Sequence, residues 1–370
     1  MAHNPLERWH EQAEALFLPY GALTRLVDTY GALELEYAAI RRGAALMDLP
    51  QRGLVCIGGK DRRSFLNNLV TQQLKNLTPG TGTYGYMLTL QGRVALDFVA
   101  LEHADNLLLD VDQRLIANLL VELEKRHFAE DVHIADVSDT YGRLLLLGPE
   151  AGALLQAHAA VAVAALSAEY SHTTGTLGAT TFTVYRHDFT GSPGYELIVP
   201  QTALVEVWEY FTRLPGPPPH NFPLVRPIGW AALNTARIEA GCLVLGVDIL
   251  EMTLPMETGP WYARAVDPNK GCYLGQEVVA RMHARQTVAR LLVGLRMGDE
   301  KVPVAGTPIF DGAEPIGIIT SSCLSPLLGA HAVALGYVKT PYAKPGRVLE
   351  VLAEGGRSKA TVSELPLVKL

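Results

Sequence analysis

Apolar and polar residues follow two different periods along this chain, which predicts a mixture of strands and helices. Short apolar runs bounded by glycine, proline or charged residues are typical of strands. Such runs predict strands at residues 53–59, 83–101, 106–111, 131–138, 142–148 and 181–200. The runs at 83–101 and 181–200 are each long enough for two strands, with turns at Gln91 and Gly92 and at residues 190–194. The chain therefore repeats a two-strand pattern.

Apolar residues spaced three or four apart predict helices between these strands. The clearest helix has Leu115, Leu119 and Leu123 on one face and begins near Asp112. Another begins at Asp61, a residue type that caps helix N-termini. Further helical patterns begin at residue 150 and cover residues 202–214 and 228–241.

The residue composition and the predicted secondary structure change twice towards the carboxyl end. Residues 215–227 are rich in proline, which predicts a linker because proline cannot join a helix or sheet interior. From about Gln286 the chain has short strands with Gly and Pro turns, the mark of a small β-barrel. We predict an α+β protein with two interleaved mixed lobes in residues 1–285 and a β-barrel domain in residues 286–370.

Composition narrows the class of protein. The 370 residues are 48% apolar and 19% charged, and the net charge is −7, which argues against nonspecific binding of nucleic acid. No apolar run is long enough to cross a membrane, and the amino terminus has no secretory pattern. The four cysteines form no C-x-x-C pair, and the eleven histidines show no metal-ligand spacing. We expect a cytoplasmic protein with no metal site and no membrane or nucleic-acid partner.

Cys272 is the first candidate for chemistry. A helix that starts near Leu274 places the sulfur at its positive end, and Lys270 is two residues away, so both features favour a thiolate. The alternative is a small buried residue at a tight turn. Around it the chain carries glycines and polar first-turn residues, namely Gly271, Gly275, Gln276 and Glu277.

Three charged residues in apolar segments are further candidates. Asp97 alternates with Leu96 and Phe98 on a strand, so it lies on an exposed face or points into a cleft. Glu196 lies inside an apolar strand, and its two oxygens suit parallel donors such as a pterin edge or an arginine. Arg237 either holds a substrate anion or pairs with a carboxylate.

Several common motifs are missing from the sequence. The run CIGGKD lacks the upstream glycine and the Ser or Thr of a phosphate loop, and no G-x-G-x-x-G is present. The run around Ser192 fails as a hydrolase elbow because Thr190 replaces the glycine. Nucleotide hydrolysis and dinucleotide redox chemistry are therefore not favoured.

The run KGCYLGQE at residues 270–277 resembles the K-G-C-Y-x-G-Q-E signature of the YgfZ-type folate-binding proteins. These are relatives of the aminomethyltransferase, or T-protein, of the glycine cleavage system. Less specific resemblances follow in the same order in residues 36–71, QGRVALDF, FTGSPGYEL and GWAALNTARIEAG. The resemblance extends from about residue 36 to the end of the chain.

This resemblance implies a three-lobed body with a tetrahydrofolate site, for tetrahydrofolate or a derivative, in its centre. It implies that Glu196 binds the pterin, that Arg237 lies near the folate and that Asp97 faces the reactive nitrogens of the folate. Tyr84, Met87 and Tyr195 are implied at the same site. The resemblance identifies Cys272 as the signature thiol of the family. The rest of the motif consists of Lys270, Gly271, Tyr273, Gly275, Gln276 and Glu277.

For the YgfZ branch, the implied role is folate-dependent support of iron–sulfur cluster assembly or repair, with assembly or client proteins as partners. The alternative is a folate-dependent aminomethyltransferase. The sequence departs from the transferase pattern at Asp110 and Asp112, where the transferase has V-N-A, and at Leu233, in a helix that keeps only Arg237 of the A-R-D-S-L-R motif. These departures favour the first role and leave the pterin site intact.

Overall fold

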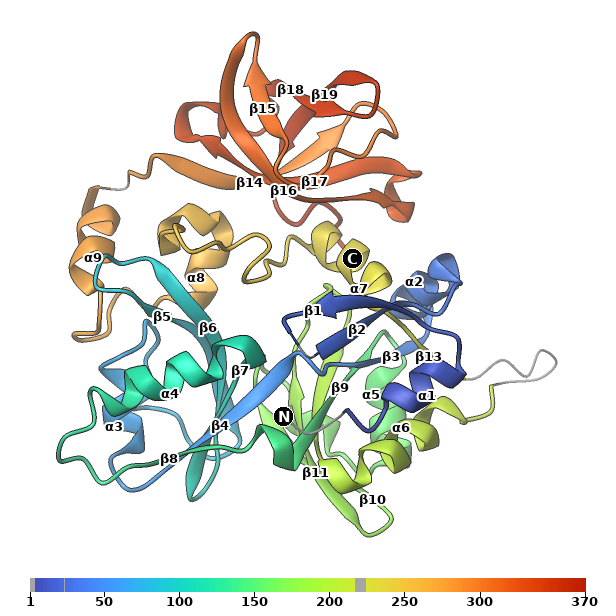
Figure 1. Ribbon diagram of the computed structural model, residues 1–370, viewed down its shortest axis with the longest axis vertical. Helices are drawn as coiled ribbons and strands as arrows, with labels where there is room; N and C mark the ends of the chain where they lie inside the picture. Colours follow the sequence, from blue (N-terminus) through green and yellow to red (C-terminus); the bar gives the residue numbers. More distant parts are fainter. Residues whose placement is uncertain (1–3, 23, 217–223, 286) are drawn as a thin grey trace.

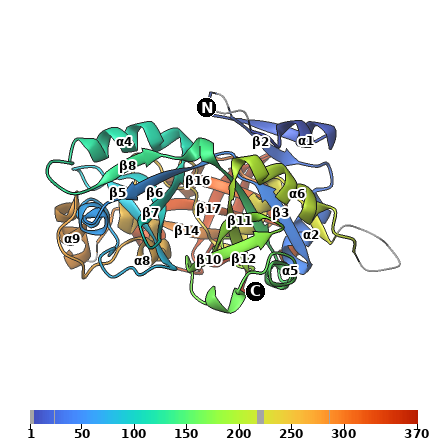
Figure 2. The ribbon, with the colours of Figure 1, turned by 90° about the horizontal axis from the view of Figure 1, so that it is seen from below.

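Three β-structures organise the chain into three lobes (Figure 1). The computed structural model describes residues 4–22, 24–216, 224–285 and 287–370. Seen from below, the two sheet lobes lie side by side (Figure 2). The proline-rich segment expected to be a linker falls largely on residues 217–223, which lie outside the described residues.

The first lobe is a five-stranded antiparallel sheet in the order β5-β6-β7-β4-β8. Its elements are β4 (Arg52–Gly58), α3 (Arg62–Asn67), β5 (Thr81–Leu88), β6 (Val94–Glu102), β7 (Asn106–Asp112), η1 (Gln113–Leu115), α4 (Ile116–Glu124) and β8 (His133–Asp136). Leu119 and Leu123 of α4 are buried against one face of the sheet with Leu96 and Phe98. Burial of each such side chain stabilises the fold by about 1.5–3 kcal/mol.

The second lobe is a six-stranded sheet in the order β10-β11-β12-β9-β3-β13, in which only the pairing of β13 with β3 is parallel. Its strands are β3 (Ala44–Asp48), β9 (Tyr141–Leu147), β10 (His172–Leu177), β11 (Thr180–Arg186), β12 (Gly194–Pro200) and β13 (Val225–Pro227). Because β3 precedes the first lobe in the chain and β9 follows it, the two lobes are interleaved as predicted.

Helices and short turns cover this second sheet. They are α1 (Glu7–Gln12), α2 (Leu33–Arg42), η2 (Ser138–Thr140), α5 (Ala151–His158), η3 (Val163–Ala165), η4 (Gln201–Ala203), α6 (Leu204–Thr212) and α7 (Trp230–Ala240). Gly241 ends α7 in the left-handed region, with φ of 71°, as expected for a helix C-cap. The strands β1 (Leu16–Tyr20) and β2 (Thr24–Thr29) pair with each other in a separate two-stranded sheet.

The third lobe is a closed six-stranded barrel in the order β14-β17-β16-β15-β18-β19. Its elements are β14 (Arg290–Met297), β15 (Pro308–Asp311), β16 (Glu314–Ser325), η6 (Pro326–Leu328), β17 (His331–Lys339), η7 (Thr340–Tyr342), β18 (Val348–Ala353) and β19 (Gly356–Ser363). The connection to it contains η5 (Pro255–Trp261), α8 (Tyr262–Ala265) and α9 (Gln276–Arg285). The α+β fold with a carboxyl-terminal barrel is therefore confirmed.

Buried polar contacts hold the barrel against α7. Asp248 accepts hydrogen bonds from Thr320 (2.6 Å) and Ser321 (2.5 Å) of the barrel and forms a buried ion pair with Arg237 of α7. A buried charge of this kind needs such partners to compensate for its lost hydration. These contacts hold the barrel against α7 of the second lobe.

One predicted helix start is confirmed without its side-chain cap, and another lies later in the chain than predicted. Asp61 is the N-cap residue of α3, but its side chain makes no cap bond and instead accepts from the backbone N–H of Asp131 (2.9 Å). The helix expected to start near Leu274 starts at Gln276. Gly275, with φ of 79°, makes the turn before it, and a Cβ there would lie 2.5 Å from the carbonyl oxygen of Thr89.

Candidate functional site

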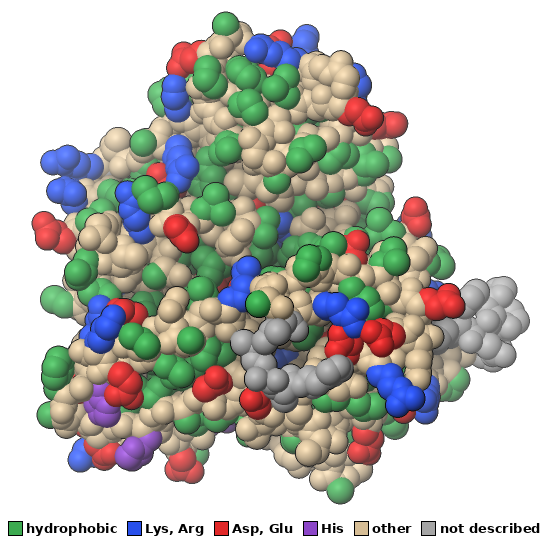
Figure 3. Space-filling view, viewed as in Figure 1, with side chains coloured by type: hydrophobic (Ala, Val, Ile, Leu, Met, Phe, Trp, Pro, Cys, Tyr) green, Lys and Arg blue, Asp and Glu red, His purple; other side chains and the backbone are tan. Residues whose placement is uncertain are grey.

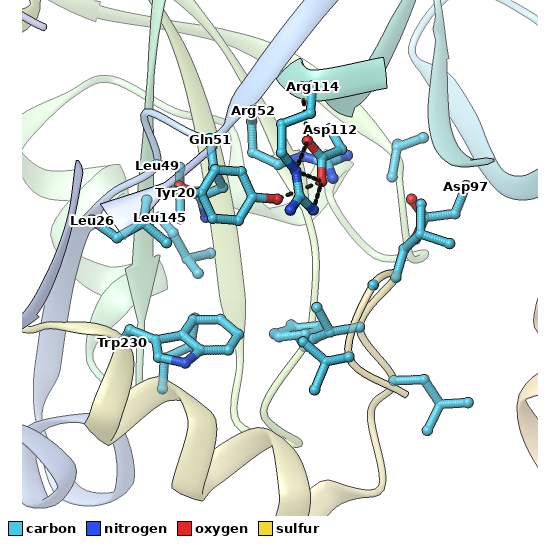
Figure 4. A pocket seen from close by; sticks show the side chains of 18 of the residues that line it. Tyr20, Leu26, Leu49, Gln51, Arg52, Asp97, Asp112, Arg114, Leu145 and Trp230 are labelled. Carbon is cyan, nitrogen blue, oxygen red and sulfur yellow. Dashed lines mark hydrogen bonds and ion pairs between the residues drawn. The ribbon is translucent and has the colours of Figure 1, made fainter. Parts of the chain in front are cut away.

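A cavity of about 280 Å³ lies between the two sheet lobes and the segment that follows α7 (Figure 4). Apolar and aromatic side chains form much of its wall, among them Leu26, Leu145, Phe189, Trp230, Leu233 and Trp261. The lining residues with acidic, basic or imidazole side chains are Arg52, Asp97, Asp112, Arg114, His187 and Glu196. Figure 3 shows hydrophobic, acidic and basic side chains intermixed over one face of the molecule.

Asp97 reaches this cavity because β6 alternates its side chains between two environments. Leu96 and Phe98 belong to the helix-covered core of the first lobe, whereas Asp97 and Val99 line the cavity. Oδ2 of Asp97 accepts a hydrogen bond from the Tyr84 hydroxyl (3.0 Å), whereas Oδ1 is buried and has no hydrogen-bond partner among the described residues. The strand thus places a half-satisfied carboxylate at the cavity wall.

Burial and nearby charges act in opposite directions on the carboxyl of Asp97. The residue is 8% exposed, and burial raises the pKa of its carboxyl above the usual value, although the charge of Arg52 and the Tyr84 hydrogen bond oppose the shift. Among the described residues, no cation forms an ion pair with Asp97. A ligand N–H or a positive charge in the cavity would satisfy Oδ1.

Glu196 also points towards the cavity, but both of its oxygens already have partners. Oε2 accepts from Nη2 of Arg143 (2.6 Å), and Oε1 lies 2.6 Å from Nδ1 of His187. Burial pushes the pKa of Glu196 upwards, but the His187 hydrogen bond and the Arg143 charge outweigh it and lower the pKa. Glu196 is therefore an ionised carboxylate held by two side chains, and arginine fills one of the donor positions that its sequence context suggested.

Asp110 lies behind Glu196 and shares the same arginine. It pairs with Arg143 and with Nε of Arg52 (2.7 Å), and it accepts from the Tyr185 hydroxyl (2.7 Å). Burial alone would raise the pKa of Asp110, but the charges of Arg143 and Arg52 lower it to about 2. The two aspartates that depart from the V-N-A pattern thus have different surroundings, since Asp110 pairs with Arg143 and Arg52 whereas Asp112 lines the cavity.

Asp112 connects the β1–β2 hairpin to the cavity rim through hydrogen bonds. Its Oδ2 accepts from Nη2 of Arg114 (2.6 Å) and from the Tyr20 hydroxyl. The Arg114 guanidinium lies 4.0 Å from the centre of the Tyr20 ring. Figure 4 shows Tyr20 and Arg114 meeting at Asp112, with Trp230 across the cavity. Leu18 also lines the cavity, so this hairpin covers it.

The other residues that the resemblance placed at the folate site divide into two groups. Tyr84 lines the cavity beside Asp97. Met87 is buried in the core of the first lobe and Tyr195 in the core of the second, because each lies on the opposite face of its strand from the cavity. Arg237 is fully buried and pairs with Asp248, so it takes the ion-pair alternative and does not line the cavity.

Cys272 lies apart from Asp97 and Glu196. It is exposed and is not one of the residues lining the cavity, so the expected convergence of all three is wrong for the thiol. The sulfur also lies four residues before α9, outside the first turn where the helix dipole acts. The turn at Gly275 places the start of α9 at Gln276, so Cys272 lies in the segment before the helix.

Lys270 explains much of the KGCYLGQE motif in structural terms. Its buried ammonium donates to the backbone carbonyls of Asn67 (2.7 Å), Val70 (2.6 Å) and Gln72 (2.6 Å). Burial lowers the pKa of Lys270 to about 8. The motif therefore fastens the segment before α9 onto the first lobe. A Cβ at Gly271 would meet open space, and Tyr273, Gln276 and Glu277 are not among the cavity-lining residues.

Sequence reasoning missed Tyr20, Arg52, Arg143 and His187. Arg143 interrupts the apolar run GRLLLLG, and a lone arginine in a buried strand signals a buried carboxylate partner. His187 lies in the segment between β11 and β12, next to the glycine turn that drew attention to Glu196. Nothing in the sequence pairs Tyr20 with Asp112, which is 92 residues away.

Two further properties concern the described residues as a whole. No three His, Cys, Asp or Glu side chains in the described ranges come together as a metal site would require. Within the same ranges, no helix has both the length and the apolar character needed to cross a bilayer.

Comparisons with known proteins agree with this architecture. Residues 6–270 match the model of the GCVT N-terminal domain, and residues 290–369 match the glycine cleavage T-protein C-terminal barrel domain. An aminomethyltransferase of Synechocystis sp. is 30% identical over 88% of this chain and 86% of its own length. Another, from Cutibacterium acnes, is 30% identical over 100% of this chain and 99% of its own length.

A solved structure shows the same arrangement of lobes. The glycine cleavage system aminomethyltransferase T from Bartonella henselae superposes with a TM-score of 0.84 at 25% identity, covering 99% of this chain and 97% of that one. The resemblance to T-proteins is confirmed, and membership of their YgfZ branch stays a prediction. The chain belongs to the glycine cleavage T-protein family.

Proposed function

We propose that this protein transfers a one-carbon unit between an aminomethylated carrier and tetrahydrofolate, with the reduced pteridine held in the central cavity. The family uses tetrahydrofolate as substrate or cofactor, and the relatives described above are named aminomethyltransferases. These comparisons favour aminomethyl transfer over the iron–sulfur role suggested by the KGCYLGQE signature.

One observation carries the proposal, namely Oδ1 of Asp97, which is buried in the wall of this cavity and has no partner in the part of the chain that the structure describes. A buried carboxylate oxygen without a partner is unfavourable, so the site is arranged for a group that supplies an N–H or a positive charge. The aromatic and apolar walls suit the flat ring of a pteridine, and the ring nitrogens of a reduced pteridine provide such donors.

The chemistry assigned to Asp97 is electrostatic. Transfer of an aminomethyl carbon develops positive charge on the carbon–nitrogen unit, and a fixed carboxylate in a water-poor cavity stabilises that charge. Tyr84 holds the carboxylate in place through Oδ2, and Trp261 in turn donates to the Tyr84 hydroxyl (3.2 Å). Oδ1 is left to face the reacting nitrogens.

Replacement of Asp97 by Asn tests this role, because it removes the charge with little change in shape. We expect transfer of the carbon from an aminomethylated lipoyl carrier to fall about 100- to 1,000-fold, a typical loss when one electrostatic contact to the transition state is removed. Asp105→Asn, on the exposed turn after β6, is the matched control. Calorimetric titration with tetrahydrofolate checks binding separately, and no saturable affinity for the wild type in the micromolar range would contradict the proposal.

Support of iron–sulfur cluster assembly or repair is the second candidate function. It is favoured by the exposure of Cys272 within the KGCYLGQE signature, because an exposed thiol is accessible to a client protein. In cells that depend on this chain, Cys272→Ala is expected to lower the activity of iron–sulfur enzymes while folate binding is retained. Cys56→Ala, which changes a half-buried thiol, serves as the control. Equal enzyme activity in both variants would remove this candidate.

A further inference from the structure

The wall of the cavity contains a histidine that the electrostatic role of Asp97 does not use. His187 lines the cavity, and its Nδ1 lies 2.6 Å from Oε1 of Glu196. This is the single hydrogen bond of the imidazole within the described part of the chain, so Nε2 has no protein partner there. The imidazole is partly exposed, with 16% of its side-chain surface accessible.

We infer that His187 and Glu196 form an acid–base pair, in which Glu196 orients the imidazole and Nε2 of His187 carries a proton during one-carbon transfer. The inference rests on the proposed function and adds to it a group that moves protons. Asp97 stabilises charge at the same cavity, and His187 removes and returns the proton.

The contacts of Glu196 fix which nitrogen of His187 is free. Glu196 is ionised, so it only accepts hydrogen bonds, and Nδ1 of His187 must therefore carry the proton between them. In the neutral imidazole, Nε2 then has a lone pair available to the cavity. Arg143 holds the other oxygen of Glu196 and prevents the carboxylate from turning away.

The other groups around the ring support this orientation. Aromatic rings surround it, with centroids at 6.2 Å for Tyr185, 5.6 Å for Tyr170 and 5.4 Å for Phe189. The adjacent Asp188 pairs with Arg186 (2.8 Å), and Asp110 is held by Arg143 and Arg52. Glu196 is thus the one carboxylate described as bonded to the imidazole.

The proton that His187 would carry follows from the balance of the reaction. A carrier thioether R–S–CH2–NH3+ and tetrahydrofolate give methylenetetrahydrofolate, the thiol R–SH and NH4+. The carbon exchanges its bonds to sulfur and nitrogen for bonds to two folate nitrogens, and each of these nitrogens loses one proton. The two protons end on the departing ammonia and the thiolate, so no oxidant or reductant is required. His187 accepts one of them at Nε2 and delivers it to a leaving group.

Nuclear magnetic resonance of the free protein tests the geometry without folate or turnover. With the ring nitrogens labelled, neutral His187 is expected to carry its proton on Nδ1, and Glu196→Gln is expected to remove the preference for that tautomer. His133, which is exposed, provides the reference signal. Assignment of the proton to Nε2 in the wild type would overturn the inference.

Kinetics test the catalytic part. His187→Ala is expected to lower kcat for carbon transfer about 100-fold or more, the usual size of acid–base catalysis, while tetrahydrofolate affinity is retained. His187→Gln keeps a donor for Glu196 but has no titratable nitrogen, so it should be equally slow. Added imidazole should restore activity to His187→Ala but not to His187→Gln. His133→Ala should have the same kcat as the wild type.

The outcomes distinguish the inference from the proposed function. Normal kcat in His187→Ala, measured beside an active wild type, would overturn the acid–base role and leave one-carbon transfer standing. Normal kcat in His187→Gln would likewise show that the residue only positions Glu196. A wild type that binds tetrahydrofolate but transfers no carbon would overturn both.

Discussion

Arg143 on β9 and Glu196 on β12 form a buried ion pair across neighbouring strands, with Nη2 and Oε2 2.6 Å apart. The same Nη2 contacts Asp110, so one guanidinium compensates two carboxylates beside the cavity. Nε and Nη1 of Arg143 are buried and have no hydrogen-bond partner within the described ranges, so its hydrogen bonds there all involve Nη2. The charge balance of the site therefore depends on this arginine.

Replacement of Arg143 by Leu should destabilise the protein strongly. Two buried carboxylates would lose a cation, and removal of one partner from a buried ion pair typically costs about 3–5 kcal/mol. Arg213→Leu is the control, because Arg213 is exposed and its pair with Glu209 is worth less than about 1 kcal/mol. Urea unfolding measures both variants. A loss for Arg143→Leu no larger than for the control would contradict this account.

Asp110 should make stability depend on acidic pH. Its pKa is about 2 in the folded protein, below its ordinary value of 3.8, so between these values the unfolded state binds more protons than the folded state. The stabilisation is therefore fully present above about pH 4 and is lost as the pH falls towards 2. Asp110→Asn should flatten the unfolding free energy over this range, whereas Asp105→Asn should follow the wild type. If the unfolding free energy of Asp110→Asn depended on pH as steeply as that of the wild type, other carboxylates would be responsible for the pH dependence.

Lys270 should be important for structure independently of Cys272. Lys270→Met removes the donor shared by three backbone carbonyls and should lower the free energy of unfolding by about 1.5–3 kcal/mol. Limited proteolysis should also become faster in the segment before α9. Lys125→Met, at an exposed lysine, should change neither measurement. Wild-type stability of Lys270→Met would leave the KGCYLGQE motif without this structural explanation.

Tyr20 should control how long a ligand stays in the cavity. The strands β1 and β2 form a two-stranded sheet of their own, so the Tyr20–Asp112 hydrogen bond contributes directly to the closure of this hairpin over the cavity. Tyr20→Phe should speed dissociation of tetrahydrofolate about 10-fold, as expected for loss of a hydrogen bond to a charged group. Stopped-flow fluorescence measures the rate, with Tyr210→Phe on α6 as the control. Equal dissociation rates would exclude a role for this contact in closure.

Alternation along single strands was the most successful guide to the site. It separated Asp97 from Leu96 and Phe98, and it singled out Glu196 in an apolar run. The same rule explains why Tyr195 and Met87 lie in cores, since each is on the opposite face of its strand from the cavity. Resemblance alone had grouped these residues with Glu196 and Tyr84.

Electrostatic partners were much harder to predict. The sequence does not indicate which carboxylate pairs with Arg237. Asp248 becomes its partner where the barrel packs against α7. Cys272 was expected at a helix start beside the site, but the turn at Gly275 shifts the helix and leaves the thiol on the surface. His187 was overlooked because its role depends on a carboxylate on another strand.

Patterns within the sequence were enough to predict the mixture of helices and strands, the barrel at the carboxyl end, and the strand faces that carry Asp97 and Glu196. These features depend on residues close together in the chain, whose periodicity fixes which side chains share a face. Only the packed structure shows that Asp97 forms no ion pair among the described residues, that Arg143 and His187 bind the two oxygens of Glu196, and that Cys272 lies outside the cavity. Such features arise when distant segments pack together, because the charge and hydration of a buried group are set by neighbours that its own segment does not contain.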